Sequence, residues 1–160
     1  MDNEFYTFRE YMKQADSQLT ASMEDYLEMI CRLSRDKGYT RVNALATALN
    51  VQPPSATKMV QKLADIGLIN YEKYGIITPT KQGQQIGHTL LERHKTIENF
   101  LRLLGLKKGV LEETEKIEHT VSSQTLEHLA AFVNFLKARP EIIENYNTFQ
   151  KRLKINRENE

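Results

Sequence analysis

Apolar residues recur every three or four positions over most of this chain, which is the spacing of amphipathic helices. The segment "LTASMEDYLEMICRL" predicts a first helix, with Ser22 as its N-cap and Asp25 in its first turn, that ends by "DKGY". Ahead of it, Phe5, Phe8 and Met12 are also spaced as on a helix. They predict a short amphipathic extension that docks on the body or on a partner chain, and a frayed tail is the alternative.

The segment "TRVNALATALNVQPPSATKMVQKLADIGLINYEKYGIITPT" predicts two short helices and a β-ribbon. A turn over residues 50–53 separates the helices, Pro54 opens the second helix, and Gly67 stops it. The ribbon has its turn at Tyr74 and Gly75. The residues expected to face the core are Leu45, Ala46 and Leu49 in the first helix, and Ala56, Met59 or Val60, Leu63 and Ile66 in the second. Helix, turn, helix and ribbon together predict a winged helix-turn-helix. The alternative is a pair of helices that pack against each other without binding DNA.

The outward face of the second helix carries side chains that can hydrogen-bond base edges or phosphates in the major groove of double-stranded DNA. These are Ser55, Thr57, Lys58, Gln61 and Lys62. In the ribbon turn, Lys73 and Tyr74 are expected to follow the DNA backbone. A plain solvated role is the alternative for each of these side chains, since most contacts in such interfaces go to phosphates.

A long helix is predicted from Thr80 to Gly105, with His94 in its middle, and two more helices follow. One spans "VLEETEKIEHTV", and the other opens at Ser122 or Ser123. Their apolar faces predict a helical platform that pairs with a second copy of the chain.

The expected fold is therefore mainly α: an N-terminal winged helix-turn-helix with a small β-ribbon wing, followed by a C-terminal helical dimerisation domain. The predicted boundaries are an N-terminal extension over 1–19, a DNA-binding domain over 20–80, and a metal-binding and dimerisation domain over 81–160.

The net charge of +1 hides a cationic middle, because residues 40–87 hold five basic and two acidic side chains. This excess is too small to establish nucleic-acid binding by itself. The N-terminus lacks a basic and apolar leader and no stretch is apolar enough to span a bilayer, so we expect a cytoplasmic protein without a membrane partner. The single Cys31 excludes an internal disulfide and a CxxC metal site, and a buried structural thiol is its expected role.

Acids and histidines occur at spacings that put them on shared helix faces. The set that could converge on one pocket is Asp25, Glu28, His94, Glu115, Glu118 and His119. Four carboxylates and two imidazoles suit Mn²⁺ or Fe²⁺ and could bridge two ions. Without metal, two carboxylates about 4 Å apart repel by roughly 4 kcal/mol at an effective dielectric near 20, so metal would act as a switch. Solvated surface acids are the alternative.

Most of the chain, from Thr20 to about Leu153, resembles the diphtheria toxin repressor family of metal-dependent transcriptional repressors, in particular its short branch of manganese transport regulators. The segments that carry the resemblance are "SMEDYLEMI", "GYTRV", "SATKMVQKL", "INYEKY", "ERHKTIENFLRLLG" and "IEHTVS". It implies a homodimer, a binuclear Mn²⁺ site that uses all six side chains named above, and repression of metal-uptake genes at a palindromic operator. Glu115 and Glu118 would bridge the metals and His119 would cap one. No small organic substrate is implied.

The resemblance also implies which metal acts, because the iron-responsive branch has a methionine where this chain has Asp25. A carboxylate is a harder ligand than a thioether, which favours manganese over iron. By affinity alone, Fe²⁺, Co²⁺ or Zn²⁺ could take the place of Mn²⁺ in the site as surrogates. The wing lacks an arginine and some lysines of the relatives, and "QPPSAT" has a second proline, so the operator sequence and its salt dependence are expected to differ.

The main rival hypothesis is a ferritin-like dinuclear metalloenzyme, whose helical bundle uses Glu-x-x-His motifs from two helices. In "EKIEH" the histidine directly follows Glu118, no second Glu-x-x-His occurs, and a winged helix interrupts the bundle. A third hypothesis is a metal-independent winged-helix protein. It leaves the six donor positions unexplained.

Overall fold

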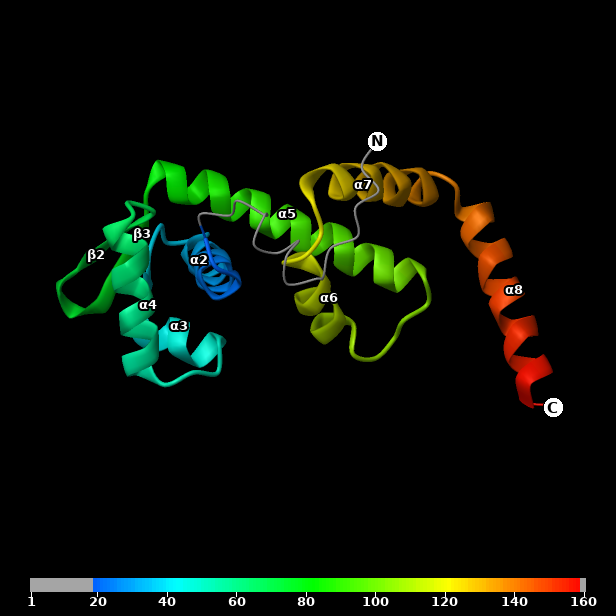
Figure 1. Cartoon of the computed structure of the whole chain (residues 1–160), viewed down its shortest axis with the longest axis horizontal. Coiled ribbons are helices and arrows are strands. Elements are labelled where there is room, and N and C mark those ends of the chain that lie inside the picture. The colour runs from blue at the N-terminus through cyan, green and yellow to red at the C-terminus, as the bar shows by residue number, and fades with distance from the viewer. Residues whose placement is uncertain (1–18, 159–160) are drawn as a thin grey trace, which may run out of the picture. The chain divides into compact units, whose positions relative to one another are not determined.

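The computed structural model describes residues 19–158, with side chains described up to Leu153. The predicted extension with Phe5, Phe8 and Met12 lies outside the described residues. The elements, in chain order (Figure 1), are α2 Ala21–Ser34, β1 Thr40–Arg41, α3 Val42–Ala48, α4 Pro53–Asp65, β2 Ile69–Glu72, η1 Lys73–Gly75, β3 Ile76–Pro79, α5 Lys81–Leu103, α6 Val110–Glu118, α7 Ser123–Lys137 and α8 Pro140–Glu158.

The chain forms two compact units that divide within α5, between Leu91 and Glu92. We call the part up to Leu91 unit 1 and the part from Glu92 unit 2. Within the described residues no helix is both long and apolar enough to cross a membrane.

The N-cap of α2 lies two residues before the predicted one. Thr20 has the extended backbone of an N-cap, and its hydroxyl oxygen accepts a hydrogen bond from the Met23 amide at 3.3 Å. The prediction that Ser22 caps this helix was therefore wrong, because Ser22 lies within the first turn. The predicted end is confirmed, since the helix stops at Ser34.

The core of unit 1 is formed by α2, α3, α4 and the small sheet. The predicted inner residues Leu45, Ala46, Ala56 and Leu63 are buried, and Val60 rather than Met59 is the buried member of its pair. Three details differ from the prediction. Leu49 is only half-buried, α4 starts at Pro53 rather than Pro54, and Ile66 is 48% exposed because it is the C-cap, where the helical periodicity has ended.

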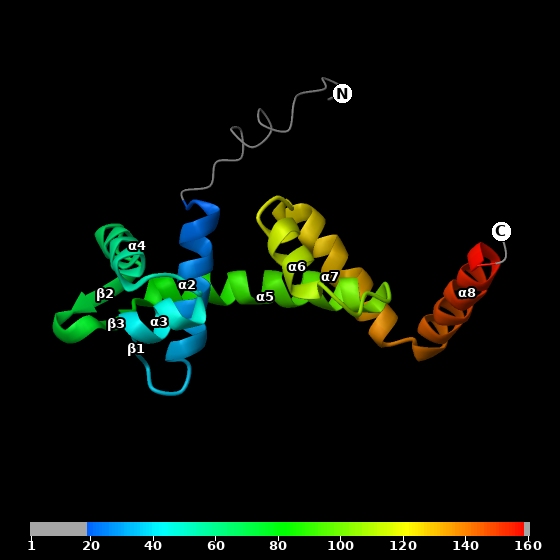
Figure 2. The same cartoon turned by 90° about the horizontal axis from the view of Figure 1, so that it is seen from below.

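The predicted ribbon is confirmed as the antiparallel pair β2 and β3, in which Tyr71 lies opposite Ile77. Its turn is η1, where Tyr74 and Gly75 both have positive φ angles, a conformation that glycine adopts freely. Figure 2 shows this turn at the tip of the ribbon, beyond the helices of unit 1. The short strand β1, which was not predicted, pairs with β3 and gives the sheet order β1-β3-β2.

Unit 2 contains the second part of α5 and helices α6, α7 and α8. Its apolar core cluster is formed by Ile97, Leu101 and Val110, against which further side chains of α6 and α7 pack. The predicted start of α7 is confirmed, since the Ser122 hydroxyl oxygen accepts from the Thr125 amide at 3.2 Å. Together with the small ribbon of unit 1, these helices confirm the predicted, mainly α fold.

Helix α8 was not predicted, and it caps the end of α5. The Leu104 carbonyl accepts hydrogen bonds from the Tyr146 hydroxyl at 3.2 Å and from the Gln150 side-chain amide at 2.8 Å. The last carbonyls of a helix have no partner within the helix, so these two bonds from α8 satisfy a group that would otherwise need water.

Candidate metal centre and DNA-binding face

Unit 2 brings four of the predicted metal donors together. His94 comes from the middle of α5, Glu115 and Glu118 come from consecutive turns of α6, and His119 is the C-cap of α6. Helix α6 is anchored by the buried Val110 and Thr114, and Glu118 lies one turn after Thr114 and is also buried. The packing of α6 therefore directs a carboxylate into the protein.

The four donors are close enough for short-range electrostatic contact. His94 Nδ1 is 3.3 Å from Glu118 Oε2 and 3.6 Å from Glu115 Oε1, and His119 Nε2 is 3.9 Å from Glu118 Oε1. Ligand atoms of Glu115, Glu118 and His119 all lie within 4.8 Å of one another. Glu118 is only 1% exposed and His94 only 3%, so both ionisable groups are removed from water and depend on each other.

Arg93 is a further member of this cluster that the sequence analysis missed. Its guanidinium lies 3.4 Å from His119 Nδ1. An arginine can only donate, so Nδ1 is the acceptor of this contact and Nε2 is the ring nitrogen that faces Glu118. The available signal was the sequence "ERHK", in which Arg93 directly precedes His94.

Unit 1 contributes the other two predicted donors, Asp25 and Glu28, from α2. They are three residues apart and so share a helix face. Glu28 is buried, and Arg32 donates to its carboxylate at 2.6 Å. The i, i+4 spacing of Glu28 and Arg32 could have predicted this ion pair.

Cys31, the only cysteine, is half-buried and its thiol donates to the Gly83 carbonyl at 3.7 Å. Burial, together with the nearby negative charge of Glu28, raises the pKa of the Cys31 thiol to about 11. A protonated thiol is a poor metal ligand. The donors that the described residues bring together are therefore carboxylates and imidazoles, the oxygen and nitrogen ligands that suit Mn²⁺ or Fe²⁺.

The predicted DNA-binding side chains lie on α4 and on the turn of the wing. Ser55, Lys58, Gln61 and Lys62 are exposed, whereas Thr57 is half-buried. The Thr57 hydroxyl donates to the Pro53 carbonyl of its own helix at 3.0 Å, which occupies its hydrogen. At the wing tip Lys73 is exposed and Tyr74 is 90% exposed. An exposed cationic helix face next to a protruding ribbon suits a DNA groove and its backbone.

Comparison with protein families gives two adjoining matches. Residues 18–77 match the N-terminal DNA-binding domain of iron dependent repressors, and residues 80–146 match the metal-binding and dimerisation domain of the same repressors. The first match contains the winged helix-turn-helix, and the second contains His94, Glu115, Glu118 and His119.

Similar proteins include two named HTH-type transcriptional regulator MntR. The one from Lysinibacillus sphaericus (strain C3-41) is 41% identical over 126 residues, which cover 78% of this chain and 91% of the relative. The one from Oceanobacillus iheyensis is 43% identical over 119 residues, which cover 74% of this chain and 81% of the relative.

Among solved structures, the manganese regulator SloR is similar with a TM-score of 0.64 and 34% identity, over 73% of this chain and 55% of that chain. A manganese-dependent transcriptional repressor in complex with manganese is similar with a TM-score of 0.62 and 28% identity, over 71% of this chain and 53% of that chain. The match therefore spans about half the length of these two structures.

Proposed function

The chain belongs to the iron-dependent repressor family, and we propose that this manganese-responsive, DNA-binding transcriptional repressor binds its effector ion through six side chains. They are Asp25, Glu28, His94, Glu115, Glu118 and His119. The observation that carries the proposal is the cluster of buried His94 and Glu118 with Glu115 and His119 in the unit that matches the metal-binding domain.

The protein is not an enzyme, because its family and its named relatives are transcriptional regulators. The ferritin-like metalloenzyme hypothesis is therefore not supported. DNA and a second copy of the chain are the partners that the two family domains imply.

Charge supports two Mn²⁺ ions per protomer, with Glu115 and Glu118 as bridging ligands and His119 as a cap. Bound metal supplies positive charge that offsets carboxylate repulsion. The four carboxylates in the set would match the charge of two divalent cations. Asp25 and Glu28 of α2 would then join the donors of unit 2 as ligands of the same ions, an assignment that rests on the resemblance and on donor chemistry. Fe²⁺, Co²⁺ and Zn²⁺ would bind as surrogates, since a given nitrogen and oxygen site generally binds these ions at least as tightly as Mn²⁺.

The proposed response to metal is a narrowing of the conformations available to the two DNA-binding domains of a dimer. Recognition helices of a dimer must reach half-sites one helical turn, roughly 34 Å, apart, which predicts a palindromic operator. If ligands from both units share ions, fewer placements of each domain remain, and less conformational entropy is lost when DNA binds. Repression of metal-uptake genes would follow when the metal is abundant.

We further propose that the functional domains follow the predicted boundaries, with DNA binding in 20–80, metal binding and dimerisation in 81–160, and an extension over 1–19.

The test is a fluorescence-anisotropy titration of a palindromic operator duplex from upstream of a metal-uptake gene, first with EDTA and then with Mn²⁺. We expect Mn²⁺ to tighten wild-type binding by about tenfold or more, a coupling of about 1.4 kcal/mol. Glu115→Ala should lose that response because it removes a donor. Glu112→Ala is the matched control, since Glu112 lies on the same helix but pairs with Lys116.

Binding that is equal in EDTA and Mn²⁺ would show that the acids are not a switch, and would favour a metal-independent winged-helix protein. A response that survives in Glu115→Ala but not in a His94→Ala variant would remove Glu115 from the ligand set and keep the rest of the site.

The DNA-binding face is tested by Lys58→Gln on α4. Loss of one phosphate contact should weaken operator and non-operator duplexes alike and lower the slope of log affinity against log salt by about one. Lys95→Gln in unit 2, which removes an exposed cation paired with Glu92, is the control and should leave the slope unchanged. An unchanged slope for Lys58→Gln would remove Lys58 from the interface.

A further inference from the structure

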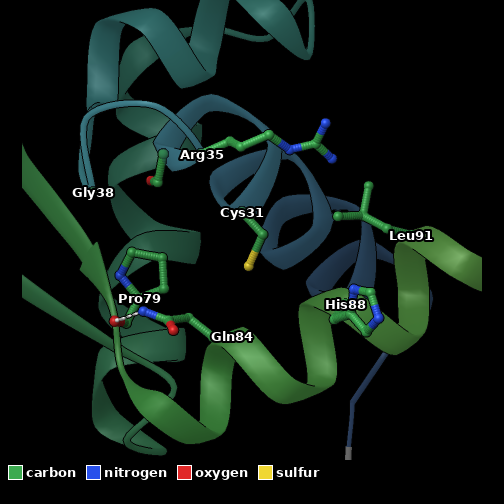
Figure 3. Close-up of a pocket in the computed structure, with 8 residues that line it drawn as sticks. Cys31, Arg35, Gly38, Pro79, Gln84, His88 and Leu91 are labelled. Carbon is green, nitrogen blue, oxygen red and sulfur yellow. Dashed lines mark hydrogen bonds between the residues drawn. The ribbon is translucent and has the colours of Figure 1, made fainter.

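A second pocket, separate from the metal donors, lies within unit 1 where the end of α2 meets the first part of α5. Its volume is about 310 Å³, and its walls include Cys31, Ser34, Arg35, Gln84, His88 and Leu91 (Figure 3). Figure 3 shows Arg35 extending from the end of α2 and His88 placed on α5 one turn after Gln84. This volume is at the lower end of the range for small-molecule sites.

The walls of the pocket are held by close packing of the two helices. Gly87 lies against Cys31, and a Cβ atom at Gly87 would collide with the Cys31 sulfur. Gly83, one turn earlier, lies against the Leu68 carbonyl in the same way. The first contact fixes how α5 sits on α2, and the second fixes how it sits on the loop before β2, so packed elements of unit 1 define the pocket.

Ser34 provides the clearest sign that a ligand is expected. The residue is only 6% exposed, its hydroxyl oxygen is buried, and no hydrogen-bond partner for it exists within residues 19–158. A buried polar group without a partner costs about 1–3 kcal/mol. The Ser34 oxygen is covered in this structure, so the hydroxyl recovers this energy when its side chain turns towards a molecule bound in the pocket.

The charges around the pocket favour an anion. Arg35 carries a permanent positive charge, His88 adds an imidazole, and no acidic residue is among the residues that line the pocket. In the part of the chain that the structure describes, neither of these two side chains makes a hydrogen bond or ion pair with the protein, so their donors can serve a ligand. The protonated Cys31 thiol adds no negative charge of its own, and the charge of the nearby Glu28 carboxylate is offset by its ion pair with Arg32.

We propose that this pocket binds a small free anion, whose carboxylate or phosphate oxygens accept hydrogen bonds from the Ser34 hydroxyl and the Arg35 guanidinium. His88 donates to the same anion when its ring is oriented towards it. Leu91 contacts a short carbon body, if the anion has one. A bidentate pair between a guanidinium and a carboxylate or phosphate is the strong form of this interaction. The site requires neither bound metal nor DNA.

The test is a titration of the full-length protein, without metal or DNA, with inorganic phosphate and separately with malonate, followed by backbone amide NMR. We expect saturable shifts confined to residues 31–38 and 84–91. Arg35→Gln should weaken binding by about tenfold or more, and Ser34→Ala by several fold, as expected for charge-assisted hydrogen bonds. Lys37→Gln is the matched control, because Lys37 is a cation of the same loop that does not line the pocket.

Shifts that stay linear with anion concentration, or that are equal in wild type, Ser34→Ala and Arg35→Gln, would overturn the proposal. A phosphate of the DNA backbone offers the same chemistry, so operator affinity is measured at several salt concentrations for Arg35→Gln. Unchanged affinity and slope support a free anion. A salt slope lowered by about one, without any binding of free phosphate or malonate, would assign the pocket to DNA and overturn the proposal.

Discussion

Two of the proposed metal ligands already have a cationic partner from the protein itself. Arg32 lies 2.6 Å from the buried Glu28 carboxylate, and Arg93 lies 3.4 Å from His119. A buried carboxylate is stabilised by such a partner when no metal is present. Arg32 is therefore expected to compete with a metal ion for Glu28.

Replacing Arg32 by glutamine should tighten Mn²⁺ binding. The Arg32 side chain is 39% exposed, so water screens its charge and the pair contributes about 1 kcal/mol or less, which limits the gain to about fivefold. The EPR signal of free Mn²⁺ measures the change during a titration. Lys37→Gln removes an exposed cation in the loop that follows α2 and should have no effect. Weaker binding by Arg32→Gln would instead show that Arg32 positions Glu28 for the metal.

Cys31 should make the stability of the fold sensitive to alkaline pH. Its pKa is raised from 9.0 to about 11 in the folded protein, so between these values the folded chain keeps a proton that the unfolded chain has lost. The folded state then binds more protons, and stability falls as pH rises through this window. Urea midpoints at pH 8 and pH 10 should fall more for wild type than for Cys31→Ala. An equal fall in both proteins would show that other groups cause it.

The contact between helices α2 and α5 depends on small residues. Because Gly87 has no side chain, α5 can approach α2 until the Gly87 backbone lies directly against the Cys31 sulfur. Interiors are close-packed, so one additional methyl group at such a contact forces the helices apart. The same contact also shapes the anion pocket.

Gly87→Ala should lower the free energy of unfolding by about 1–3 kcal/mol, because overpacking outweighs the better helix propensity of alanine. Urea unfolding measures the loss. The double variant Cys31→Ala/Gly87→Ala should recover part of it, since the colliding sulfur is gone. Thr89→Ala, at an exposed position of the same helix, should change stability by less than about 0.5 kcal/mol. Strictly additive effects of the two substitutions would contradict the collision.

The sequence predicted the elements with strong local signals. Hydrophobic spacing located α2 to α7, and Tyr74 with Gly75 located the wing turn. The missed features depend on contacts distant in the chain. Strand β1 is only two residues long and exists through β3, and α8 ends α5 through bonds to Leu104. The cap at Thr20 was missed because Ser22 offers the same chemistry two residues later.

The candidate site was predictable as a set of residue types, while its internal contacts were not. The spacing of Glu115, Glu118 and His119 showed that they share a helix face, but sequence could not reveal that Glu118 is buried against His94. Arg93 and the pocket beside Ser34 were missed for the same reason. Both depend on which helix faces another, and that is decided by packing.

Unit 2 exposes large apolar side chains, whose contact with water is unfavourable. Those on α6, α7 and α8 are Leu111, Phe132, Phe135, Phe149 and Leu153. Aromatic residues are enriched in the interfaces between protein chains. They are consistent with the match of this unit to a dimerisation domain.

We predict that Phe135→Glu weakens the homodimer by about tenfold or more, because a buried charge at an apolar interface is costly. Sedimentation velocity over a range of concentrations, in EDTA and in Mn²⁺, measures the dissociation constant. Asn134→Glu introduces the same charge at the neighbouring exposed position and should have a smaller effect. A dimer that resists Phe135→Glu under both conditions would place the interface on another surface.

The two hydrogen bonds that α8 makes to Leu104 also bear on how the protein is made by the ribosome. Their donors lie 42 and 46 residues after the acceptor, whereas the ribbon of unit 1 pairs strands that are close in the chain. Since synthesis proceeds from the N-terminus, the DNA-binding unit can fold while the remainder is still being translated. The end of α5 can be completed only after the last helix has left the ribosome. An mRNA truncated before the codon for Tyr146 would thus yield a folded unit 1 followed by a unit 2 in which the end of α5 lacks its hydrogen bonds from α8.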